Sequence, residues 1–138
     1  MNGDTTTLTG TDDRAVREVL HGVYTAWADN DADAFVAHFT DDATSILPGS
    51  YRAGKEEIRA RMAAAFAGPL KGSRVLDEVR GVRFPGEDAA VVVSRSGVLM
   101  AGETEVPAAR WVIATWVLTR REGRWLLAAY HNCPAETA

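Results

Sequence analysis

The spacing of apolar residues changes near Ser73, and this change most constrains the fold of the 138-residue chain. Before Ser73, apolar residues recur at intervals of three and four, which is the period of an amphipathic helix. After Ser73, the chain breaks into short β-rich runs separated by turn residues, which is typical of antiparallel strands. Helices followed by strands predict an α+β fold in which the helices cover one face of a sheet.

Three helices are predicted in the first half of the chain. The residues Thr11-Asp12-Asp13 supply N-cap side chains for a first helix of about 16 residues. Its apolar stripe comprises Val16, Val19, Leu20, Val23, Tyr24 and Trp27. A short second helix places Phe35 and Phe39 at an i, i+4 spacing. A third helix covers Lys55–Ala67 and ends at Gly68-Pro69.

The remaining runs predict one short strand and four long ones. The short strand is Ala43–Leu47, and the long strands are Arg74–Phe84, Ala89–Met100, Ala108–Arg121 and Arg124–Cys133. The last two long strands are joined by only Glu122 and Gly123, which predicts a tight hairpin. We expect the three helices to cover the concave face of a strongly curved antiparallel sheet.

The length predicts a single domain over residues 12–134, with residues 1–11 as a disordered N-terminal tail and residues 135–138 as a C-terminal tail. The net charge of −4 lacks the basic excess that binds nucleic-acid phosphates or anionic lipids, so neither is expected as a partner. No stretch is apolar and long enough to span a membrane, and the Thr-rich start lacks the apolar core of a signal peptide. A cytoplasmic location is therefore expected.

Neither a metal nor a cofactor is predicted. Cys133 is the single cysteine, which excludes an intrachain disulfide and cysteine-based zinc sites. No His, Asp and Glu triplet has metal-binding spacing, and no glycine-rich phosphate motif or dinucleotide fingerprint is present. These observations favour cofactor-independent acid/base chemistry, or binding alone.

Five short stretches carry a resemblance to a known superfamily. They are Ala28–Phe35, Phe39–Ala43, Leu47-Pro48-Gly49, Gly54–Ile58 and Gly123–Asn132. In this order they resemble the nuclear transport factor 2-like, or SnoaL-like, superfamily over residues 12–134, which implies its cone-shaped, cystatin-like fold. The last stretch is similar to the final strand of the SgcJ/EcaC subgroup, whose members occur in enediyne and related polyketide pathways.

The resemblance implies a conical pocket but no particular reaction, because the superfamily holds isomerases, cyclases, dehydratases and binding-only members. In its ketosteroid isomerase branch, an Asp base precedes the Pro of the short first strand. Leu47 occupies that position here, which argues against that isomerase mechanism. Tyr24 is a candidate counterpart of the branch's helical Tyr, although an ungapped match places Val23 there.

His131 is the predicted catalytic residue. Across a two-residue turn, paired residues have numbers that sum to 245, which places His131 opposite Ala114 and on the same face as Trp116. An imidazole between small side chains and an aromatic wall suits general acid/base catalysis, and the alternative is a core histidine with a backbone partner. In this register Asn132 faces the other side with a structural role, unless a twist or bulge at Pro134 re-aims it toward a substrate.

Five further residues are candidates for substrate contact. Tyr24, Trp27 and Phe39 lie on helical apolar stripes, so they form either core or an apolar wall over a planar ligand. Trp116 adds an aromatic wall beside His131. Arg110 supplies a cation for an anionic substrate, or else marks a solvated strand end.

Three functional hypotheses follow from these residues. The leading one is a pocket protein of a secondary-metabolite pathway that assists cyclisation, isomerisation or dehydration of an apolar, polyketide-like substrate through His131. The alternative is a non-catalytic accessory protein that binds a polyketide or polyene intermediate beside a biosynthetic enzyme. A third is an interaction protein without a ligand.

The chain is also expected to form a homodimer. The predicted outer face of the sheet is too apolar to remain in water, and a twofold association of two sheets would bury it. The residues assigned to that face are Trp111, Ile113, Val117, Leu126 and Tyr130.

Overall fold

The computed structural model describes the backbone of residues 2–135 and the side chains of residues 10–135, so residues 136–138 of the predicted C-terminal tail lie outside the described residues. The helices are α1 (Asn2–Ala28), α2 (Ala32–Val36) and α3 (Lys55–Ala67), and a 3-10 turn covers Ala108–Arg110. The strands are β1 (Phe39–Leu47), β2 (Ser50–Ala53), β3 (Arg74–Gly86), β4 (Ala89–Leu99), β5 (Val112–Arg121) and β6 (Arg124–Pro134). The predicted α+β class is confirmed.

The six strands form one sheet in the order β2-β1-β6-β5-β4-β3. Every neighbouring pair is antiparallel except β1 and β6, which are parallel. The long connection between β1 and β6 allows this pairing, since parallel strands cannot be joined by a tight turn. β2 is absent from the predicted strands. It forms because Pro48 and Gly49 turn the chain back on itself, with a φ of 75° at Gly49, so that Leu47 pairs with Ser50.

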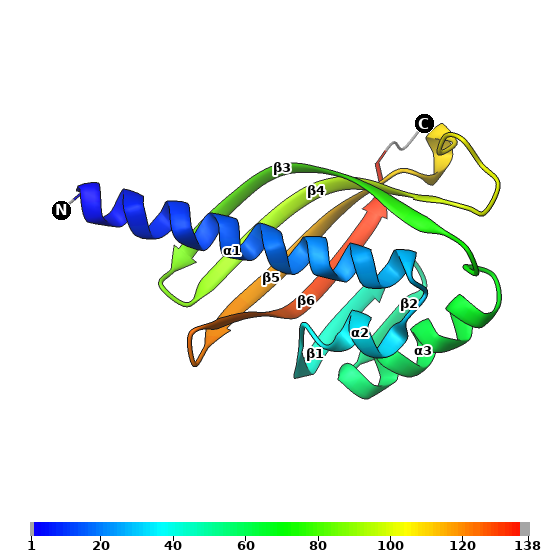
Figure 1. The fold of residues 1–138 in the computed structure, drawn as a ribbon, viewed down its shortest axis with the longest axis horizontal. Helices are drawn as coiled ribbons and strands as arrows, with labels where there is room; N and C mark the ends of the chain where they lie inside the picture. Colours follow the sequence, from blue (N-terminus) through cyan, green and yellow to red (C-terminus); the bar gives the residue numbers. More distant parts are fainter. Residues whose placement is uncertain (1, 136–138) are drawn as a thin grey trace.

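The helices cover the inner, concave face of this sheet (Figure 1). α1 crosses that face, while α2 and α3 lie together at the end of the sheet beside β1 and β2. The apolar stripe of α1 is buried as its spacing predicts, with Val16, Leu20 and Val23 packed in one core that also includes Trp116 and Leu127. The core therefore forms between α1 and the central strands.

α1 begins earlier than predicted, at Asn2 instead of near Thr11, so residues 2–11 are helical where a tail was expected. Asp12 therefore lies inside α1 and does not cap it. Its carboxylate accepts hydrogen bonds from Arg120, at 3.1 Å, and from Trp125, at 3.4 Å. Asp13 instead forms an i, i+4 ion pair with Arg17 at 2.8 Å. Asp12 and Asp13 thus bind side chains of β5, β6 and α1 instead of capping the helix.

The register of β5 against β6 shifts by one residue after Val117, which leaves Ala128 as a β-bulge. The predicted sum of 245 holds only between the turn and this bulge. Beyond it, Asn132 instead of His131 lies opposite Ala114. A bulge reverses which side chains face the core, because strand side chains alternate with a period of two.

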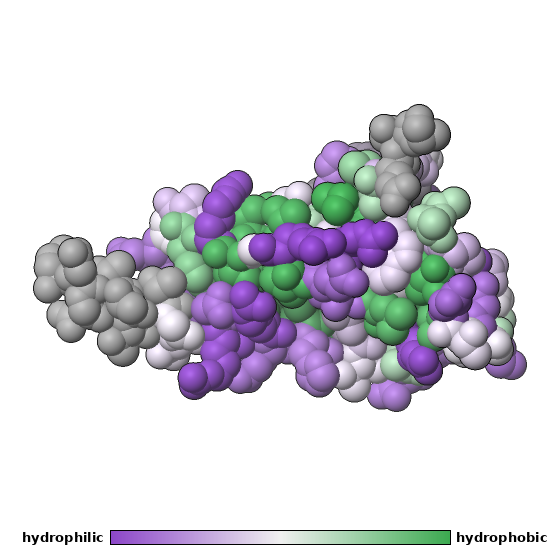
Figure 2. All heavy atoms as spheres, turned by 90° about the horizontal axis from the view of Figure 1, so that it is seen from above, coloured by the Kyte–Doolittle hydropathy of each residue, from purple (hydrophilic) through white to green (hydrophobic). Residues whose placement is uncertain are grey.

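The outer face of the sheet carries half-buried apolar side chains. They include Val91, Val93, Ile113, Val117 and Leu126. Viewed from the edge where β3 lies, a row of hydrophilic side chains has hydrophobic surface on both sides of it (Figure 2). Among the described residues, no helix combines the length and the apolar character that crossing a membrane requires.

Candidate functional site

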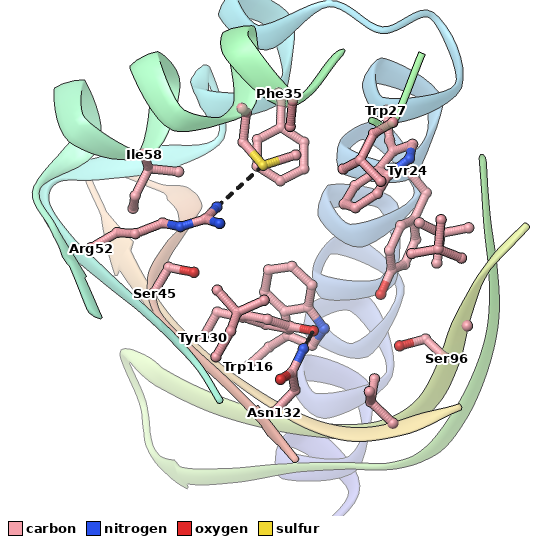
Figure 3. Close-up of a pocket in the computed structure, with 18 of the residues that line it drawn as sticks. Tyr24, Trp27, Phe35, Ser45, Arg52, Ile58, Ser96, Trp116, Tyr130 and Asn132 are labelled. Carbon is pink, nitrogen blue, oxygen red and sulfur yellow. Dashed lines mark hydrogen bonds between the residues drawn. The ribbon is translucent and has the colours of Figure 1, made fainter. Parts of the chain in front are cut away.

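A cavity of about 320 Å³ lies between the helices and the inner face of the sheet (Figure 3). Its wall is mainly apolar and includes Trp27, Phe35, Phe39, Leu47, Ile58, Met62, Leu70, Val75, Val98, Val112 and Trp116. Sites for small organic molecules are usually of this kind, with an apolar lining and a few placed polar groups.

The cavity brings together all six residues that were predicted to contact a substrate. They are Tyr24, Trp27, Phe39, Arg110, Trp116 and Asn132. These residues come from α1, β1, the 3-10 turn, β5 and β6, so only the folded chain places them around one space. Their role in binding stays a prediction.

His131 does not line the cavity, and its predicted position there is wrong. Its side chain is exposed, and its backbone pairs with Thr115 on one side and Ile46 on the other. The cause is the bulge at Ala128, which reverses the alternation of the last part of β6. The same reversal brings Tyr130, expected on the outer face, into the cavity wall.

Aromatic rings form two groups in the wall of the cavity. On the sheet side, the ring centroid of Trp116 lies 4.2 Å from that of Tyr130 and 6.2 Å from that of Tyr24. On the helical side, Trp27 packs edge-to-face against Phe35, with centroids 6.0 Å apart. Such rings offer extended faces to a planar apolar ligand.

Polar atoms gather where β5 and β6 reach the cavity. Asn132 Nδ2 donates a hydrogen bond of 2.8 Å to the hydroxyl of Tyr130. Asn132 Oδ1 and Trp116 Nε1 are buried and have no partner among the described residues. Burial raises the pKa of Tyr130, so its hydroxyl stays protonated at neutral pH. Because buried polar atoms are normally paired, this cluster leaves an acceptor and a donor for a bound molecule.

Tyr24 links the cavity to a carboxylate behind it. Its hydroxyl donates a hydrogen bond of 3.1 Å to Asp77 Oδ1, which lies half-buried on the inner side of β3. Burial raises the pKa of Asp77 above its usual range. Burial, and then the charge of Asp77, raise the pKa of Tyr24. A carboxyl group with a raised pKa therefore lies one hydroxyl away from the cavity.

Two arginines line the cavity, and their surroundings differ. Arg110 forms an ion pair with Glu103 and donates a hydrogen bond of 3.1 Å to the carbonyl oxygen of Val98. Arg52 has a buried Nε without a partner, and its Nη1 lies 3.4 Å from the sulfur of Met62. Burial lowers the pKa of Arg52. The charge of Arg110 is thus compensated by an ion pair, while Arg52 forms no ion pair with the described residues.

Four polar residues of the site, Arg52, Ser45, Asp77 and Ser96, were not among the residues predicted from the sequence. Arg52 pairs with Ser45 across the turn at Pro48-Gly49, so a two-residue hairpin at this turn would have placed both side chains on one face. Asp77 occupies an inward position of β3, as the alternation with Val75 indicates. The hairpin pairing and the strand alternation can be predicted from the sequence. They show which side chains share a face of the sheet, but not that this face lines a cavity.

The polar residues outside the cavity fit structural roles. Asp42 accepts a hydrogen bond of 2.9 Å from the Thr40 hydroxyl within β1. His38 is half-buried, and burial followed by the charge of Arg124 lowers its pKa. In the part of the chain that the structure describes, no three His, Cys, Asp or Glu side chains form a candidate metal site.

Comparison with known proteins gives a family and a fold. A family model described as a SnoaL-like domain matches residues 16–135. A domain of unknown function with a cystatin-like fold from Nostoc punctiforme is 29% identical, with a TM-score of 0.85, and the match covers 92% of this chain and 79% of that one. None of the curated proteins matches this sequence.

Two less similar solved structures share the fold. A candidate scytalone dehydratase from Novosphingobium aromaticivorans is 15% identical, with a TM-score of 0.78, and the match covers 96% of this chain and 90% of that one. A ketosteroid isomerase-like protein from Erwinia carotovora is 21% identical, with a TM-score of 0.72, and the match covers 90% of this chain and 96% of that one.

Proposed function

Because the chain belongs to the SnoaL-like domain family, we propose that its cavity binds an apolar organic molecule that carries a carbonyl or hydroxyl oxygen. The observation that carries this proposal is the pair of unpartnered buried atoms, Asn132 Oδ1 and Trp116 Nε1, within an apolar wall. A ligand oxygen would satisfy the indole N–H, and a ligand hydroxyl would satisfy the amide oxygen. Leaving such atoms unpaired costs free energy that a bound molecule recovers.

Tyr24 and Asp77 are the groups we propose for proton transfer, in place of His131. When Asp77 is ionised it accepts the Tyr24 proton as the Tyr24 oxygen accepts one from the ligand, and the reverse transfer returns it elsewhere on the ligand. The raised pKa of Asp77 favours this role, because a general base works best when its pKa lies near the operating pH. No cofactor takes part in such a step.

We propose a cyclisation, isomerisation or dehydration of a polyketide-derived substrate as the reaction. All three need a proton removed at one atom and returned at another. The similarity of the last strand to the SgcJ/EcaC subgroup supports a secondary-metabolite pathway. The fold shared with a ketosteroid isomerase-like protein supports a cavity of suitable shape, while the chemistry rests on the residues of this chain.

The second candidate function is binding without catalysis, as an accessory to a biosynthetic enzyme. The pKa values of Tyr24 and Tyr130 are both raised, so both hydroxyls remain protonated at neutral pH. Two permanent hydroxyls can hold a ligand oxygen without exchanging protons with it. This observation favours a holding role if Asp77 takes no part.

Mass spectrometry of the gently purified native protein, followed by turnover assays on the retained compound, tests these alternatives. In the catalytic case, Tyr24→Phe and Asp77→Asn each lower turnover by roughly 100-fold and keep binding. Tyr51→Phe is the matched control, since Tyr51 is 62% exposed and lies outside the cavity. A wild-type protein that retains a compound but leaves it unchanged, alone and with pathway enzymes, would support the accessory function.

A further inference from the structure

Arg52 brings a positive charge to the cavity without an acidic partner among the described residues. Its Nε is buried and unpaired, and its nearest hydrogen-bonding contact is the thioether of Met62, which is a weak acceptor. Burial lowers the pKa of Arg52, and the positive charge of Arg61 outweighs the negative charge of Glu57. The guanidinium is therefore only partly compensated by the protein.

Arg110, the second arginine of the cavity wall, has its positive charge compensated by an acidic partner. Arg110 donates to both carboxylate oxygens of Glu103 and also to the carbonyl oxygen of Val98. The backbone N–H of Met100 donates to the same carboxylate at 2.8 Å, which fixes the position of Glu103. The Arg110 side chain is thus held by internal partners, whereas the buried Nε of Arg52 has no partner among the described residues and its Nη1 contacts only a thioether.

The fold holds Arg52 at one side of the cavity. It projects from β2 beside Ser45 of β1, whose side chain faces the same side of the sheet because the two residues are paired. Tyr24 and Ser96 lie on the opposite side of the space, with Tyr130 between the two sides (Figure 3). A molecule that fills the cavity therefore has Arg52 at one end and the Tyr24 hydroxyl at the other.

We propose that Arg52, with the hydroxyl of Ser45, forms a subsite for the carboxylate of an amphipathic organic acid whose apolar body occupies the aromatic part of the cavity. This inference rests on the proposed function and names its ligand class. A cation taken out of water without a partner is costly, and an incoming anion restores its interactions. The guanidinium fork presents parallel N–H groups that match the two oxygens of a carboxylate.

The surroundings of Arg52 favour a single negative charge over a phosphate. The guanidinium of Arg52 neutralises one negative charge, and the Ser45 hydroxyl can donate one hydrogen bond to it. Ile58 and Met62 beside them in the cavity wall are apolar. A doubly charged phosphate would bring a second charge into that wall without a cation to pair with it, because Arg110 is already bound to Glu103. An aryl or polyene carboxylic acid fits both the charge and the apolar wall.

Two probes of nearly equal size test the subsite. 1-Naphthylacetic acid is ionised at pH 7, whereas 1-naphthylacetamide is neutral, and titration calorimetry measures the affinity of each. For the wild-type protein we expect the acid to bind roughly 10- to 100-fold more tightly than the amide. In Arg52→Gln, this preference disappears through loss of affinity for the acid, while affinity for the amide stays within about twofold of the wild-type value.

Arg61→Gln is the matched control, because Arg61 is an exposed cation of α3 near Arg52. It should leave the preference for the acid unchanged. Amide binding by the Arg52→Gln protein also shows that the variant is folded.

Three results overturn the inference. If the wild-type protein binds the acid and the amide with equal affinity, there is no carboxylate subsite, but the proposed ligand-binding function of the cavity still holds. If Arg52→Gln lowers the affinity for the acid and for the amide equally, Arg52 supports the packing of the cavity and does not bind the carboxylate. If neither probe binds the wild-type protein, the proposed ligand-binding function fails together with the subsite.

Discussion

The hydroxyl of Tyr24 and the carboxylate of Asp77 are joined by a hydrogen bond of 3.1 Å across 53 residues of sequence. Tyr24 lies on α1 and Asp77 on β3, so this bond ties the long helix to the edge strand of the sheet. Both groups are poorly solvated, and burial is the largest cause of the raised pKa of each. The hydrogen bond thus links α1 to β3, and the raised pKa of Asp77 lets its carboxyl group hold a proton at a higher pH than an ordinary Asp does.

Asp77 should make the stability of the protein depend on pH. Because its pKa is raised in the folded state, the folded protein binds this proton more tightly than the unfolded chain does. The free energy of unfolding therefore falls as pH rises from the ordinary Asp range through the raised pKa. Urea denaturation at a series of pH values should show this fall in the wild-type protein, and a shallower one in Asp77→Asn. Asp41→Asn, at an exposed position, is the control, and parallel wild-type and Asp77→Asn profiles would contradict the prediction.

Gly22 and His38 should be coupled through one close approach. A Cβ at position 22 would lie 2.7 Å from Nε2 of His38, so Gly22→Ala must displace the imidazole. Burial lowers the His38 pKa, and displacement toward solvent should bring it back toward about 6.5. NMR titration of the His38 ring measures the shift, with the exposed His21 as an internal reference. A His38 pKa unchanged by the substitution would show that the ring moves without gaining water.

Neighbouring residues of β6 should respond differently to substitution because of the bulge. His131→Gln changes an exposed side chain, so affinity for 1-naphthylacetamide should stay within about twofold of the wild-type value. Asn132→Leu removes the hydrogen bond to Tyr130 and the unpaired Oδ1, and should weaken binding of the amide by roughly tenfold. Fluorescence titration measures both. The reverse order of effects would mean that the strand has the unbulged register in solution.

We propose that the outer face of the sheet forms a twofold homodimer interface. Val117 lies at its centre, paired with Val91 on β4 and Ala129 on β6. Light scattering at micromolar concentration should give twice the 14.9 kDa chain mass. Val117→Lys should reduce it to the monomer mass, because it buries an unpaired charge. Glu87→Lys, in the exposed turn after β3, is a control for added charge, and a wild-type monomer would rule out this interface.

Local spacing was enough to predict the buried stripe of α1 and the last hairpin, but not every boundary, because Phe39, expected on the second helix, is the first residue of β1. The stripe of Val16, Leu20 and Val23 is buried because a helix repeats its face every 3.6 residues whatever it packs against. At the last hairpin, Glu122 and Gly123 both have positive φ, at 52° and 77°, which is what a two-residue turn between twisted strands requires. Signals of this kind act over a few residues, so they can be read in the chain itself.

The site depended on relationships that no local pattern contains. The residue type at Ala128 does not mark a bulge, yet the bulge there places Asn132 instead of His131 in the cavity wall. Arg52 and Arg110 are the same residue type, but Glu103 compensates only one of them. Which charge remains unpaired is decided when distant segments pack together, because pairing depends on distance in space and not on distance along the sequence.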